Sequence, residues 1–114
     1  MTFGEKKFYA EFEDADNIPV ELDASKTKDE VNFGRKAHIC AISVSHGNDD
    51  YVIVKLRKEE DTRPFWKHKF YKGLNGQVFF LPIPKGGVSK IVIEIEPKPG
   101  TTITDSVLVN ISYI

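Results

Sequence analysis

The chain has 114 residues, a formal net charge of −1, and ordinary fractions of hydrophobic (40%) and charged (29%) residues. These values predict one globular domain over residues 1–114, with no overall field that would favour nucleic acid or an anionic membrane. The single cysteine, Cys40, excludes an internal disulfide and a cysteine-based zinc site. No stretch has the apolar length of a signal peptide or a membrane span, so we expect a soluble chain, in a compartment that the sequence does not specify.

Alternation of apolar and polar residues with a period of two dominates the chain and is typical of β-strands. The segments that alternate, or that are apolar almost throughout, are 8–13, 38–46, 51–57, 65–72, 77–83, 90–96 and 106–114. Residues 17–22 are a weaker candidate, because Pro19 confines such a strand to the edge of a sheet. Residues 25–33 fit either a strand or one helical turn, and stretches containing Gly, Pro, Asn or Asp separate the segments as turns.

No window has the spacing of an amphipathic helix, so the sequence predicts an all-β fold with little or no helix. Eight or nine short strands, one every ~10–12 residues, favour an antiparallel β-sandwich with a jelly-roll-like arrangement. An immunoglobulin-like topology is the alternative, although the cysteine pair of true immunoglobulin domains is missing. In architecture alone, the pattern resembles the small β-sandwiches used as carbohydrate-binding modules and as viral or phage attachment domains.

Charge is distributed unevenly along the chain. Residues 1–30 contain nine acidic residues and four lysines, whereas residues 62–93 contain six basic residues and no acidic one. If the acidic and basic segments lie on neighbouring strands, their charges would pair and stabilise the fold, with each cross-strand pair contributing ~0.2–1 kcal/mol. Placed on opposite faces, the same charges would suit an anionic ligand or head-to-tail self-association.

The stretch RPFWKHKFYKG, residues 63–73, combines four aromatic and four basic residues around one histidine. Sugars stack on aromatic rings and lysines bind hydroxyl or acidic groups, so the stretch indicates a binding surface. The simpler interpretation is a strand with Trp66 and Phe70 in the core and a solvated outer face. A protein interface is also possible in this composition, and nucleic acid is disfavoured by the net charge. The candidate ligand-binding residues are Arg63, Phe65, Trp66, Lys67, His68, Lys69 and Tyr71.

Two acidic turns, at residues 13–17 and 47–50, place oxygen ligands of the kind that calcium prefers. They do not match the EF-hand pattern, and Asp and Asn are also common turn formers. Calcium is therefore the one cofactor that the sequence suggests, with these candidate ligands: Asp14, Asp16, Asp49 and Asp50.

Motifs of catalysis are absent from the sequence: it has no G-x-S-x-G, H-E-x-x-H, P-loop or G-x-G-x-x-G pattern. Cys40 lies in an apolar segment, where an inert buried thiol is expected. We therefore predict a non-catalytic binding or attachment module, with carbohydrate as the favoured partner. The alternative is a structural β-sandwich subunit that self-assembles, in which the basic stretch 63–73 packs on the acidic N-terminal strand of a neighbour.

Overall fold

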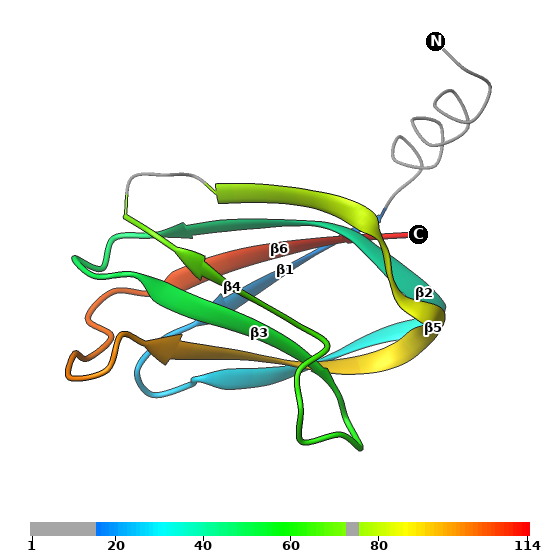
Figure 1. Ribbon diagram of the computed structural model, residues 1–114, viewed down its shortest axis with the longest axis horizontal. Coiled ribbons are helices and arrows are strands. Elements are labelled where there is room, and N and C mark those ends of the chain that lie inside the picture. Colours follow the sequence, from blue (N-terminus) through cyan, green and yellow to red (C-terminus); the bar gives the residue numbers. More distant parts are fainter. Residues whose placement is uncertain (1–15, 73–75) are drawn as a thin grey trace, which may run out of the picture.

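A computed structural model of the chain describes residues 16–72 and 76–114, and these residues form antiparallel β-strands and no helix (Figure 1). The strands join in one six-stranded sheet with the order β1-β6-β2-β5-β3-β4. Within these residues, there is no helix of the length and apolar character that crossing a membrane requires. The strand bounds are β1 Asp16–Leu22, β2 Lys28–His46, β3 Val52–Lys58, β4 Trp66–Phe70, β5 Gly76–Pro97 and β6 Val107–Tyr113.

The all-β, antiparallel prediction is confirmed, but the predicted count of eight or nine short strands is not. The segments predicted as 25–33 and 38–46 form the single strand β2, and those predicted as 77–83 and 90–96 form β5. The Gly and Pro residues of 82–87 indicated a turn between the latter two segments, whereas the chain bends there and continues as a strand. The predicted strand 8–13 lies outside the described residues. The edge position predicted from Pro19 is confirmed, since β1 is the first strand of the sheet.

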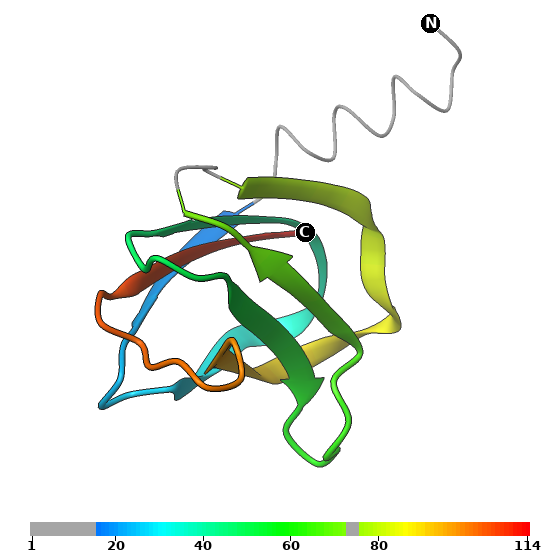
Figure 2. The same cartoon turned by 60° about the vertical axis from the view of Figure 1, so that its left-hand side comes forward.

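The bend of the sheet arises in the long hairpin of β2 and β5. Their register shifts between Asn32 and Ala37, and again before Ala41. Gly34 on β2 and Gly86 on β5 have positive φ angles of 75° and 90°, which residues with a Cβ rarely adopt. Bulges and glycines of this kind turn a strand sharply without ending its pairing. The sheet therefore curls around one core (Figure 2).

The core is built from the inward-facing residues of every strand. The register aligns these residues in rows that cross the sheet. In one such row, Ile18 of β1, Ile111 of β6 and Ile42 of β2 stand next to one another. The largest fully buried side chains are Leu22, Ile39, Ile42, Leu56, Ile91, Ile93 and Ile111. This arrangement explains the strict alternation of the sequence, because residues two apart along a strand share one face.

The bend of β5 yields a prediction about stability. Gly87 has a φ of +78°, and a Cβ at this position would lie 2.6 Å from Lys36 Cγ and 3.2 Å from the Ala37 carbonyl oxygen. We expect Gly87→Ala to lower the free energy of unfolding by about 2 kcal/mol, measured by urea denaturation, because backbone strain and close contact act together. Gly86→Ala is the matched control, since its φ is +90° but no heavy atom lies within 4 Å of the added Cβ. Equal losses of unfolding free energy in the two variants would show that the contact of the added Cβ with Lys36 and Ala37 has no effect.

Candidate functional site

The short edge strand β4 carries the centre of the stretch that the sequence singled out. Trp66 pairs with Leu56 and Phe70 pairs with Val52, both buried residues of β3. Phe70 is itself buried, and Trp66 is half-buried and packs against the core. Their ring centroids lie 6.2 Å apart, with His68 between them at 6.0 Å from Trp66. The interpretation of a strand with Trp66 and Phe70 on its core side is therefore correct.

The other face of β4 is basic and exposed. Lys67 stands opposite Lys55 of β3, and Lys69 stands opposite Ile53. These side chains border a shallow hollow of about 660 Å³. The residues that line it are Ile53, Lys55, Lys67, His68, Lys69 and Glu96. Of the seven candidate ligand-binding residues, the structure thus brings together Lys67, His68 and Lys69.

The remaining candidates lie apart from this hollow. Arg63 is exposed in the turn before β4, and Phe65 packs partly against the core. Tyr71 is 54% exposed and meets Tyr51 edge-on, with 5.7 Å between ring centroids. The Lys69 ammonium lies 4.5 Å from the centroid of the Tyr51 ring, within the range of a cation–π contact. The aromatic residues therefore do not form one row of exposed platforms.

Ion pairs on β3 and β5 neutralise part of the basic surface. Lys55 pairs with Glu96, and the Arg57 Nε donates a hydrogen bond of 2.7 Å to Glu94 Oε1. Within the described part of the chain, Lys67 forms no ion pair, so its charge faces solvent. Sequence reasoning missed Lys55 and Glu96. The alternation of residues 51–57 and 90–96 places both on outer faces, but it does not show that the two strands lie beside each other.

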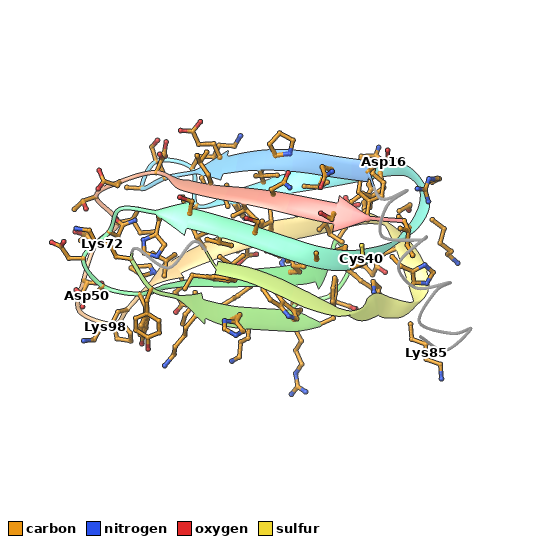
Figure 3. All side chains as sticks on the ribbon, turned by 90° about the horizontal axis from the view of Figure 1, so that it is seen from above. Asp16, Cys40, Asp50, Lys72, Lys85 and Lys98 are labelled. Atoms are coloured by element: carbon orange, nitrogen blue, oxygen red, sulfur yellow. The ribbon has the colours of Figure 1, made fainter. Side chains whose placement is uncertain are left out.

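The candidate calcium ligands are separated in space. Asp16 and Asp50 lie at opposite ends of the molecule (Figure 3). Asp49 and Asp50 form ion pairs with Lys72 and Lys98, at 3.0 and 3.7 Å. Asp14 lies outside the described residues, among which no cluster of three or more His, Cys, Asp or Glu side chains could hold a metal. A calcium site at either acidic turn stays a prediction.

Cys40 occupies a closed environment near the end of β6. The side chain is buried, and its thiol donates to the Ser112 carbonyl oxygen at 3.4 Å. Burial raises the pKa of the Cys40 thiol, so the reactive thiolate is disfavoured at neutral pH. The predicted burial of Cys40 is therefore confirmed.

A second surface lies on the outer side of β1, β6 and β2. We call it the uncharged face, and Glu21 is the charged residue at its border. Leu108, which stands opposite Glu21 at one end of this face, is 52% exposed. The Asn17 side-chain oxygen accepts hydrogen bonds from Asn110 Nδ2 at 3.2 Å and Ser112 Oγ at 2.6 Å. The uncharged face consists of Asn17, Pro19, Ser43, Ser45, Leu108, Asn110 and Ser112.

These features define the chain as an all-β antiparallel protein with one basic and one uncharged surface. No family model matches the sequence, and no curated protein matches it. Among solved structures, the chain is similar to the core of NLP from Drosophila, with 14% sequence identity and a TM-score of 0.54. The match covers 89% of this chain and 99% of that one. The crystal structure of that core provides insight into its pentamer formation and histone binding.

The prediction of a carbohydrate-binding module with a glycan partner is wrong. The solved structure that shares the fold belongs to a protein studied for pentamer formation and histone binding, not for sugar binding. The geometry gives a physical reason, because Trp66 packs against the core and cannot offer its whole ring as a stacking platform. The alternative prediction, a self-assembling subunit, agrees better with this likeness.

Proposed function

We propose that this chain is a non-catalytic, self-assembling β-subunit that acts by binding other protein chains. The fold likeness to the Drosophila NLP core supports this proposal, since that core forms pentamers and binds histones. Two features of the chain itself support it further. One is the uncharged face, and the other is the basic edge at β4.

We also propose that the strands of this chain are arranged as a jelly-roll-like sandwich. Residues 39–46 of β2 pair with β6, whereas residues 28–32 pair with the second half of β5, which also pairs with β3. Each long strand would thus contribute to two layers, with β1 and β6 in one layer and β3 and β4 in the other. The outer sides of these layers differ in character, because the described outer side chains of β1, β6 and residues 39–46 of β2 are uncharged next to Glu21, whereas the second layer carries lysines and glutamates.

The uncharged face is the observation that carries the proposal. Other outer surfaces of the described residues carry charged side chains, for example Lys55 and Glu94 on β3 and β5. Depletion of charge is the compositional mark of the buried centre of a protein interface. The Asn17 side-chain oxygen already accepts hydrogen bonds from Asn110 Nδ2 and Ser112 Oγ, so covering it with a second chain would not leave that oxygen without a partner.

A test of assembly follows directly. We expect light scattering to give a mass that is a multiple of 12.9 kDa. We also expect Leu108→Glu to shift the mass toward 12.9 kDa, because each subunit would bury an unpaired carboxylate in the interface. An effect of this kind weakens association by about 10²-fold or more.

Thr102→Glu is the control for this experiment. Thr102 is exposed in the loop between β5 and β6. Its replacement by Glu adds the same negative charge as Leu108→Glu, but outside the uncharged face. Its mass should equal that of the unchanged chain. A monomer at high concentration would contradict self-assembly, whereas an assembly that survives Leu108→Glu would contradict only the choice of face.

A further inference from the structure

We infer that the hollow beside Lys67 and Lys69 binds the turn between β3 and β4 of a second copy of this chain. We call the hollow the basic hollow, and residues 59–61 of the turn the acidic tip. The inference goes beyond assembly through the uncharged face, because it adds a second contact that uses different strands. It is carried by the charge of the hollow, the charge and order of the turn, and the position of both on one hairpin.

The basic hollow has an excess of positive charge. Lys55 and Lys67 are register partners on β3 and β4, and like charges that stand directly opposite each other destabilise a sheet. Glu96 pairs with Lys55, but within the described residues no carboxylate forms an ion pair with Lys67 or Lys69. The Lys69 ammonium lies over the Tyr51 ring instead. A further carboxylate in the hollow would therefore relieve a repulsion that the described part of one chain leaves in place.

The acidic tip presents carboxylates to solvent. Glu59, Glu60 and Asp61 are exposed, and in the described part of the chain none of their carboxylates has an ion pair or a hydrogen bond. The backbone of the tip is braced, because Arg57 Nη1 donates to the Glu59 and Asp61 carbonyl oxygens at 3.3 and 3.1 Å. The turn projects away from the body of the fold (Figure 1). A turn that is already ordered loses little conformational freedom on binding, which favours association.

The basic hollow is large enough for the acidic tip. Its volume of about 660 Å³ lies within the range of ~300–1,000 Å³ that is usual for ligand pockets. The half-buried Ile53 lines it together with the lysines. A glutamate that enters would thus place its methylene groups against apolar surface and its carboxylate near Lys67 and Lys69.

The positions of tip and hollow point to a second copy as the source of the turn. Lys69 stands opposite Ile53, three residues farther from the turn than Leu56, and no ion pair joins the tip to the hollow within the described residues. Because both lie on the β3–β4 hairpin, two copies related by a two-fold axis would make the contact twice. The two contacts act together, so surface ion pairs that are weak one by one give a measurable association.

Charge reversal followed by mixing tests the inference. We expect Lys67→Glu/Lys69→Glu and Glu59→Lys/Glu60→Lys each to weaken association by about tenfold at low salt, measured by light scattering over a dilution series. In each variant, like charges meet on both sides of the contact. An equimolar mixture of the two variants should associate as the unchanged chain does, because every basic group then meets an acidic group of the other chain. Mixing cannot restore a contact that forms within one chain.

The control is Lys85→Glu/Lys98→Glu, which makes the same change in net charge at two exposed lysines at opposite ends of the molecule (Figure 3). It should associate as the unchanged chain does. Full association of either charge-reversed variant at low salt would overturn the inference. Failure of the mixture to recover would also overturn it, and would indicate that the lysines meet an acidic segment of another protein.

The outcome can be separated from that of the proposed function. If Leu108→Glu lowers the mass while the charge-reversed variants associate fully, the proposed function stands and the inference fails. If the mixture recovers while Leu108→Glu keeps the mass of the unchanged chain, the inference stands and the choice of the uncharged face fails. A chain that is monomeric at every concentration and at low salt would overturn both.

Discussion

Replacing Asn48 with alanine should lower the free energy of unfolding by about 2–4 kcal/mol. Asn48 is only 4% exposed, and its side chain joins the loop after β2 to the loop before β6. Its Oδ1 accepts the backbone N–H of Thr104 at 2.7 Å and of Asp105 at 3.0 Å. Its Nδ2 donates to the Asp105 carbonyl oxygen at 3.0 Å. Alanine would remove three hydrogen bonds made by a side chain that is nearly buried, and each such bond contributes about 0.5–1.5 kcal/mol.

The backbone of Asn48 belongs to the same network. Its N–H donates to His46 Nδ1 at 3.1 Å, and the His46 Nε2–H donates to the Phe70 carbonyl oxygen at 2.7 Å. Because the backbone N–H can only donate, His46 must carry its proton on Nε2. The network thus ties the end of β2 to the end of β4.

Urea denaturation measures the effect, with Asn32→Ala as the matched control. The Asn32 side chain also accepts a backbone hydrogen bond, from Gly34 at 2.9 Å, but it is exposed and water can replace it. A loss within about 1 kcal/mol is therefore expected for Asn32→Ala. Asn48→Asp should be intermediate, since it keeps the two accepted bonds and loses the donated one. Equal losses for Asn48→Ala and Asn32→Ala would show that the network contributes nothing beyond a surface contact.

Local patterns predicted the strands well because each strand has one face in the core. The alternation around Val54 and Ile93 identified β3 and the second half of β5, and Pro19 placed β1 at an edge. The same patterns failed at Gly86, where a positive φ angle bends a strand that continues. A glycine in a turn and a glycine in a bent strand look alike in sequence, because the difference depends on pairing with a distant segment.

The candidate site was predictable only within single strands. Period two separated Lys67 and Lys69 from Trp66 and Phe70, but which side meets the core depends on β3, since Leu56 and Val52 stand opposite those rings. The uncharged face could not be predicted at all. Its residues come from three strands that are distant in sequence, and no local pattern shows that they share a surface.

The half-buried position of Trp66 leads to the second large effect, because its ring packs against the core at the sheet edge. We expect Trp66→Ala to lower the free energy of unfolding by about 2–3 kcal/mol, somewhat less than for a fully buried tryptophan. Tyr71→Ala is the control, since Tyr71 is 54% exposed and should change stability by no more than about 1 kcal/mol in the same urea titration. A stable Trp66→Ala variant would mean that the ring contributes little to the core and is available to a ligand or partner. The expected loss instead assigns the ring to folding, on the face of β4 opposite Lys67 and Lys69.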